Sequence, residues 1–271
     1  MPPAEQGQER VLVAVGSGPE ATRMLHAGRR VAALLEAELD VVRVLDHPEP
    51  VVEPNGPTEV RLIRGDPERA LLGELAADDV LLLVISARTH QLGPRPFGHV
   101  TRGVVTRASK PVLVVSPGGP SGPSFSHALV ALEGDDATSM AVARVLDRLS
   151  AAGVIMTVVH VFNEVTRPRF LDRPTRDLES LAREFLDRHV ASRTDRLRWR
   201  VGPVARRIAD VAEDEGADFI VVSWNQHLDM GHAAVLVDLL EQTNLPVLLV
   251  PILGASRSQA LAATHADSQS G

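Results

Sequence analysis

Short apolar runs alternate with segments of helical spacing along the chain. Val11–Val15 and Val80–Ser86 contain no charged residue, which is typical of strands that are buried on both faces of a parallel sheet. Pro19–Leu39 instead places apolar residues three and four positions apart, as an amphipathic helix does. Strands that alternate with helices predict right-handed β-α-β units and an α/β fold with parallel sheets.

The two halves of the chain repeat the same order of elements. The segment RGDPERALLGELAADDVLLLVIS is similar to VGPVARRIADVAEDEGADFIVVS, and SKPVLVVSP is similar to NLPVLLVPI, which indicates internal duplication. One element differs between the halves. A helix is expected within Thr175–Ser192, between the second and third strands of the second half. The corresponding HPEPVVEPNGP of the first half is too short and too rich in proline for a comparable helix.

The break between the halves is rich in proline, glycine and serine, which is typical of a linker. Both ends of the chain consist mainly of small and polar residues, and we expect them to be disordered. The expected boundaries are 10–116 for the first domain, 117–126 for the linker, 127–252 for the second domain, and 1–9 and 254–271 for the ends.

The composition excludes several kinds of site and partner. The 271 residues include no cysteine, which rules out disulfides, thiolate nucleophiles and cysteine-based metal sites. The net charge of −7 and the lack of a basic face disfavour nucleic acid as a partner. The apolar runs are far shorter than the roughly 20 residues that cross a bilayer, and the N-terminus has no apolar core. We therefore expect a cytoplasmic protein without membrane contact.

A glycine-rich turn follows the first apolar run. Gly16-Ser17-Gly18 opens the pattern G-x-G-x-x-A, which is the spelling of a dinucleotide-binding turn. Pro19 lies inside the pattern, however, and the corresponding turn of the second half, LEGDDAT, lacks it. A dehydrogenase or nucleotide hydrolase would also need a substrate domain, for which the duplication leaves no room.

The element order, the GDP followed by a helix before VLLLVIS, and the closing segment GHVTRGVVTRASKPVLVV together resemble tandem universal stress proteins. Within the closing segment, Gly98, Thr101, Ala108 and Pro111 stand at the offsets of the family motif. The resemblance implies two duplicated five-stranded parallel-sheet sandwiches of the adenine-nucleotide alpha-hydrolase-like type. It also implies that their last strands pair as an intramolecular pseudo-dimer, and that two chains form a homodimer through edge strands.

The same resemblance implies where a nucleotide would bind. In nucleotide-binding members, the adenine and ribose lie near an Asp after the first strand and near the second strand. Their phosphates lie on a glycine loop and on the hydroxyls of the closing motif. The candidate nucleotide-binding residues of this chain are therefore Gly16, Ser17, Gly18, Val44, Arg88, Gly98, His99, Thr101, Glu133 and Gly134.

This chain departs from the family pattern at most of these contacts. Gly16 and Glu133 replace the Asp, and His99 replaces the first serine of the closing motif. The Gly-x-x-Gly becomes Ser86–Thr89 in the first half and Ser223–Gln226 in the second, and side chains there obstruct a close backbone approach. The closing motif of the second half has no hydroxyl, whether it is aligned from Pro246 or on its Gly-His.

We find no catalytic or metal-binding pattern, neither G-x-S-x-G nor H-E-x-x-H. His160, Trp199 and Trp224 are interpreted as packing residues. The sequence therefore favours a non-catalytic protein of stress response or signalling whose degenerate sites do not bind ATP in the usual manner, with an unknown protein partner and no certain cofactor. The alternative is a nucleotide sensor that binds ATP, AMP or another small anion in the first domain.

Overall fold

The computed structural model describes residues 8–18, 20–46, 59–87, 97–120, 122–162, 175–191, 194, 196–226 and 231–253. The described chain divides into two compact units, the first with Met1–Phe125 and Asn244–Leu248, the second with Ser126–Thr243 and Leu249–Gly271. The division falls at the end of the segment that the sequence identifies as a linker. The division assigns the first two residues of the last strand, Val247 and Leu248, to the first unit.

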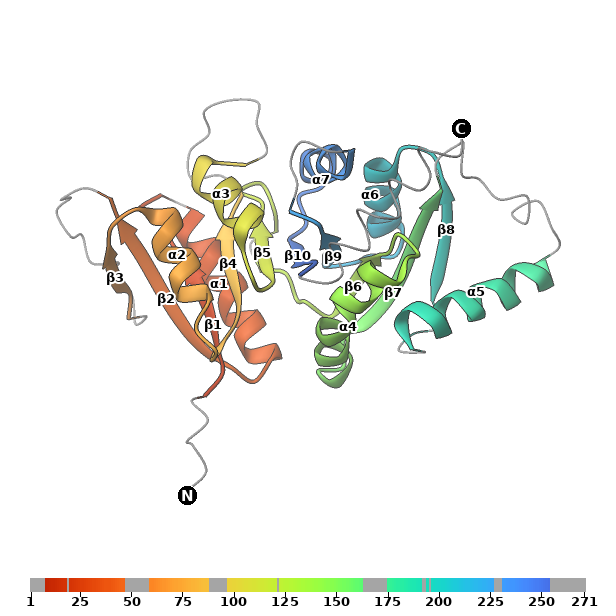
Figure 1. The fold of residues 1–271 in the computed structure, drawn as a ribbon, viewed down its shortest axis with the longest axis horizontal. Coiled ribbons are helices and arrows are strands. Elements are labelled where there is room, and N and C mark those ends of the chain that lie inside the picture. The colour runs from red at the N-terminus through yellow and green to blue at the C-terminus, as the bar shows by residue number, and fades with distance from the viewer. Residues whose placement is uncertain are drawn as a thin grey trace, which may run out of the picture. The chain divides into compact units, whose positions relative to one another are not determined.

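The first unit is an α/β sandwich built around a parallel sheet. Its strands lie in the order β3-β2-β1-β4-β5, and each neighbouring pair is parallel. Helices α2 and α3 pack against each other, and α1 packs on β1, β2 and β4 (Figure 1). The elements are β1 (Arg10–Ala14), α1 (Glu20–Leu34), β2 (Glu38–Leu45), β3 (Arg61–Arg64), α2 (Pro67–Leu75), β4 (Val80–Ser86), α3 (His99–Arg107) and β5 (Val112–Val115).

The second unit repeats this architecture. Its strands lie in the order β10-β9-β6-β7-β8, and the pairs β9-β6, β6-β7 and β7-β8 are parallel. Helices α4 and α5 pack together, as do α6 and α7 (Figure 1). The elements are β6 (His127–Ala131), α4 (Asp136–Ala151), β7 (Ile155–Phe162), α5 (Thr175–Val190), β8 (Leu197–Val201), α6 (Val204–Asp214), β9 (Phe219–Trp224), α7 (Gly231–Gln242) and β10 (Val247–Pro251).

The α/β class expected from the sequence is confirmed, and the continuous apolar runs are the buried central strands. Every residue of β5, β6 and β10 is buried, as two covered faces require. The first helix is shorter than its periodic segment, since α1 ends at Leu34. The question of a missing helix in the first domain concerns residues 47–58, which lie outside the described residues.

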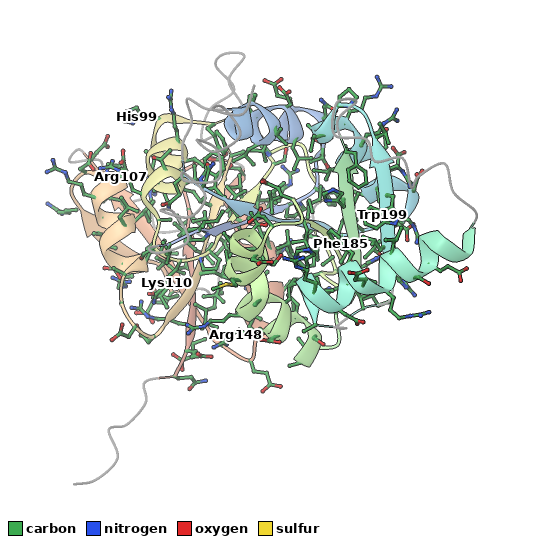
Figure 2. All side chains as sticks on the ribbon, turned by 45° about the vertical axis from the view of Figure 1, so that its right-hand side comes forward. His99, Arg107, Lys110, Arg148, Phe185 and Trp199 are labelled. Atoms are coloured by element: carbon green, nitrogen blue, oxygen red, sulfur yellow. The ribbon has the colours of Figure 1, made fainter. Side chains whose placement is uncertain are left out.

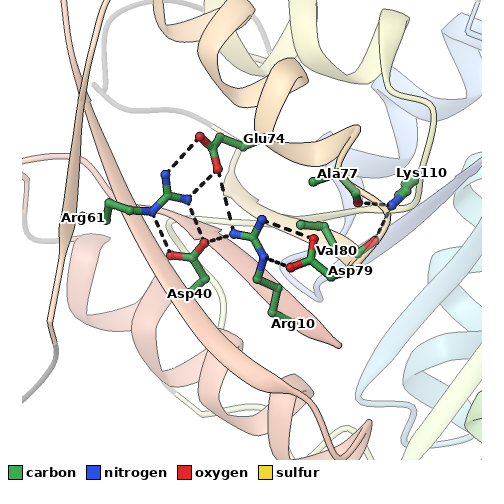
Figure 3. A network of polar contacts seen from close by, with 8 residues as sticks. All are labelled: Arg10, Asp40, Arg61, Glu74, Ala77, Asp79, Val80 and Lys110. Carbon is green, nitrogen blue, oxygen red and sulfur yellow. Dashed lines mark hydrogen bonds and ion pairs between the residues drawn. The ribbon is translucent and has the colours of Figure 1, made fainter. Parts of the chain in front are cut away.

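An ion-pair network joins the amino ends of the strands in the first unit (Figure 3). Arg10 at the start of β1 binds Asp40 and Asp79, and Arg61 of β3 binds Asp40 and Glu74. Hydrogen bonds from Arg61 lower the pKa of Glu74, and a hydrogen bond from Arg10 lowers the pKa of Asp79. Parallel α/β sheets bind ligands at the carboxyl ends of their strands. The network lies at the opposite, amino ends, so its role is structural.

Candidate functional site

The carboxyl edge of the first sheet holds most of the candidate residues. Gly16, Ser17 and Gly18 form the turn between β1 and α1, and Val44 lies half-buried near the end of β2, paired with Ile63. Gly98 and His99 begin α3 beside the end of β4. The structure thus places these residues at one edge of one sheet. Arg88 lies outside the described residues.

The space over the glycine turn is taken by an acidic side chain. A Cβ on Gly18 would overlap the carboxylate of Glu20, so that carboxylate folds back onto the turn. Glu20 is also the first residue of α1, where the helix dipole favours a negative charge. A phosphate at this turn would therefore meet a carboxylate in the position that an anion prefers. The sequence reasoning missed Glu20, although its place at the start of the helix signals this role.

The closing motif of the first unit uses its donors within the protein. The backbone N–H of Gly98 donates to the carbonyl of Ala87 at 2.8 Å. The hydroxyl of Thr101 donates to the carbonyl of Ser86 at 2.7 Å, and Thr101 is only 2% exposed. Two groups that the resemblance assigns to phosphate thus fasten α3 to the end of β4. His99 is exposed at the first turn of α3 (Figure 2).

In the second unit, Glu133 and Gly134 lie in the turn between β6 and α4. Glu133 is exposed. Gly134 has a φ of 82°, a backbone conformation that residues with a side chain rarely adopt. A Cβ on Gly134 would stand 3.2 Å from both His160 Cε1 and Phe185 Cε2. Glycine at this position therefore lets the turn pass over two packed rings.

Aromatic rings fill the carboxyl end of β7, the second strand of this unit, near which the resemblance places the adenine, and they extend onto the neighbouring β8. His160 and Phe162 of β7 share one face of the sheet, and Trp199 is the register partner of His160 on β8. Phe162 and Trp199 stack with 5.5 Å between ring centroids, and Phe185 of α5 meets Trp199 at 5.2 Å (Figure 2). The chain's own rings thus occupy this edge. Strand alternation alone could have placed His160 and Phe162 on the same face. The contact of Phe185 with these rings could not be predicted from local sequence, because it depends on how α5 packs on the sheet.

The closing motif of the second unit is apolar where the first unit has Thr101. Counted back from the closing proline, the corresponding residue is Leu236, which is 2% exposed. The hydroxyl of Ser223, at the end of β9, is buried and has no hydrogen-bond partner. The unit therefore lacks both the hydroxyl of the motif and the hydrogen bond that the first unit makes with it.

Within the described ranges, no group of three or more histidine, aspartate or glutamate side chains could hold a metal ion. The helices that the structure describes include none that is long and apolar enough to cross a bilayer.

Comparison with known proteins gives a family match for the second half of the chain. The model of the universal stress protein family matches residues 124–251. No curated protein matches the chain. Among solved structures, a universal stress protein from Archaeoglobus fulgidus DSM 4304 is 13% identical with a TM-score of 0.66, and the match covers 91% of this chain and 100% of that one. A functionally unknown protein from Pseudomonas aeruginosa PAO1 is 14% identical with a TM-score of 0.65, covering 91% and 94%.

Residues 124–251 thus match the universal stress protein family, in agreement with the resemblance found in the sequence for this half. The two solved structures share the α/β fold over most of the chain, first unit included. At 13% and 14% identity they show the fold and no more.

Proposed function

We propose that the chain is a tandem universal stress protein that acts in stress response or signalling without catalysis, and that neither of its domains binds ATP in the usual manner of the family. One observation carries this proposal. Gly98 and Thr101 already bond within the protein, Glu20 covers the glycine turn, and the rings of Phe185 and Trp199 cover the ends of β7 and β8.

The first unit supports the proposal through its hydrogen bonds and its charge. A phosphate would have to break the bonds of Gly98 and Thr101 to β4, and each donor would gain one partner while it lost another. It would also approach the carboxylate of Glu20 at the glycine turn. Like charges repel strongly at short range when they are partly shielded from water.

The second unit supports the proposal through its packing. A nucleobase at the ends of β7 and β8 would have to displace Phe185 from Trp199 and His160. Ring pairs of this kind contribute about 0.5–1.5 kcal/mol each beyond their buried area. Leu236 provides no hydroxyl whose contact with a phosphate could offset that cost.

Calorimetry with ATP, AMP and cyclic AMP, each with and without Mg²⁺, tests the proposal. Titrations at two temperatures avoid a null result from a vanishing enthalpy. We expect dissociation constants of about 1 mM or weaker for every nucleotide. A dissociation constant of this size corresponds to a binding free energy of about −4 kcal/mol. Micromolar binding of ATP that Gly98→Val and Thr101→Ala both abolish would overturn the proposal and establish the nucleotide sensor of the first domain.

The blocking role of Glu20 gives a sharper test. Glu20→Gln keeps the size of the side chain and removes its charge, so the affinity for AMP or inorganic phosphate should rise, by about tenfold for the removal of one close like charge. The matched control is Glu38→Gln, which makes the same change in charge at the exposed amino end of β2. An equal rise in both variants would show a general charge effect and no blocked site.

A further inference from the structure

Helix α5 lies on the second unit through a cluster of aromatic rings and histidines near its C-terminal end. Phe185 meets His160 of β7 at 5.3 Å and Trp199 of β8 at 5.2 Å between ring centroids. His189, one turn later, meets Phe185 at 4.5 Å and is 8% exposed. Val190 is 1% exposed. The end of α5 therefore buries one imidazole of its own and covers a second one on the sheet.

The hydrogen bonds of the two histidines fix which nitrogen carries the proton. His160 Nδ1 lies 2.8 Å from the carbonyl oxygen of Leu132, which can only accept, so Nδ1 is the donor. The hydroxyl of Ser139 has one hydrogen, which it donates to the carbonyl of Asp135 at 2.7 Å. Ser139 Oγ must then accept from His189 Nδ1 at 2.9 Å. In the neutral state, both imidazoles therefore keep their lone pair on Nε2.

We propose that α5 is held on the second unit by a proton-sensitive latch, formed by His160, His189, Phe185 and Trp199, which stays closed while both imidazoles are neutral. A second proton can enter either ring only at Nε2, because each Nδ1 already carries one. The added charge would stand among aromatic rings and beside the other histidine. Release of α5 to water removes this cost, so protonation favours the released helix.

The charged groups that act on the two histidines lie on α5, on the turn before α4 and at the start of α4. Burial lowers the pKa of His160, opposed by the hydrogen bond to Leu132 and by Glu133 of the turn before α4. Burial also lowers the pKa of His189, helped by Arg188 and His160 and opposed by the carboxylates at the start of α4. Those carboxylates are Asp135, which caps α4, and Asp136.

The direction of the pH effect follows from these shifts. A histidine whose pKa is lower in the packed state binds a proton more readily once it is released. The packed helix is therefore fully favoured above the ordinary histidine pKa, near 6.5, and loses stability as the pH falls below that value. Attraction between an imidazolium and the ring faces reduces the effect but does not restore the lost hydration.

Amide hydrogen exchange at pH 7.5 and pH 5.5, corrected for intrinsic rates, tests the latch on the full chain. We expect opening of α5 to be several-fold more frequent at pH 5.5 than at pH 7.5, because both histidines bind a proton more readily once the helix is released. Helix α6 of the same unit serves as the internal reference. The double variant H160N/H189N should abolish the difference, because asparagine can place a donor near Nδ1 and cannot take up a proton.

The matched control is His99→Asn, which removes an exposed histidine of the first unit and should leave the pH effect unchanged. Imidazole titration by NMR in the wild-type chain keeps the proposal testable if the double variant does not fold. Values at or above about 6.5 for both histidines, or equal exchange of α5 at the two pH values, would overturn the latch. This outcome is independent of nucleotide binding.

Discussion

At the scale of single residues, the strongest feature of the first carboxyl edge is that Thr101 bonds inward. Its hydroxyl reaches the carbonyl of Ser86 from a position that is almost fully buried. A side chain in this setting ties α3 to β4 and leaves its only hydrogen unavailable to a ligand. The residue expected to bind phosphate therefore stabilises the fold.

This interpretation predicts a loss of stability in Thr101→Val, which keeps the shape and removes the hydroxyl. The variant loses the hydrogen bond to the carbonyl of Ser86, and we expect the free energy of unfolding to fall by about 1–2 kcal/mol. Urea unfolding measures the change. Thr101→Ser keeps the hydroxyl and is the control. If the Thr101→Val variant unfolded like the wild type while the Thr101→Ser variant was destabilised, the hydrogen bond would contribute nothing.

At the scale of elements, two helices begin on an aspartate that caps them. Asp66 accepts the backbone N–H of Arg69 at the start of α2, and Asp135 accepts that of Thr138 at the start of α4. The cap of α2 follows from its sequence, because an Asp followed by proline is a common way for a helix to begin.

Removal of the first cap gives a prediction for α2. Asp66→Ala leaves an orphan N–H in the first turn and should lower the free energy of unfolding by about 1 kcal/mol. Asp66→Ser retains an acceptor and should cost less than half as much. Thermal unfolding of the two variants side by side measures the difference, and equal melting temperatures would contradict the assigned cap.

The elements were easier to predict from the sequence than the site. Apolar runs such as Val80–Ser86 indicated the strands, since period and burial are local properties. Glu20 over the glycine turn and Phe185 over Trp199 depend on how distant segments meet, which no local pattern encodes. The family offsets placed the candidate residues at the carboxyl ends of the strands in each sheet, but they did not show which donors were already in use.

At the scale of the whole molecule, the network of Arg10, Arg61 and their carboxylates fastens the amino ends of three strands to the C-terminal end of α2 in the first unit. Asp40 binds both arginines, so the network is continuous from β1 to β3 (Figure 3). Charges in networks of this kind hold each other better than isolated surface pairs do.

The first unit should accordingly become less stable in acid. The carboxyl pKa values of Glu74 and Asp79 are lowered in the fold. Their contribution is therefore complete above the ordinary carboxyl pKa, near 4, and is lost as the pH falls through the lowered values. The free energy of unfolding should decrease more steeply between about pH 5 and pH 3 in the wild type than in Glu74→Gln. Parallel curves would contradict this role.

The chain's single lysine gives the first unit one unusual property. Lys110 Nζ donates to the carbonyl of Val80 at 2.7 Å and to that of Ala77, so it closes the turn that follows α2 (Figure 3). Reagents that acylate side-chain amines have one lysine target in the whole sequence. A label attached there would report on a single defined position, and it would do so by displacing the contact that it was meant to observe.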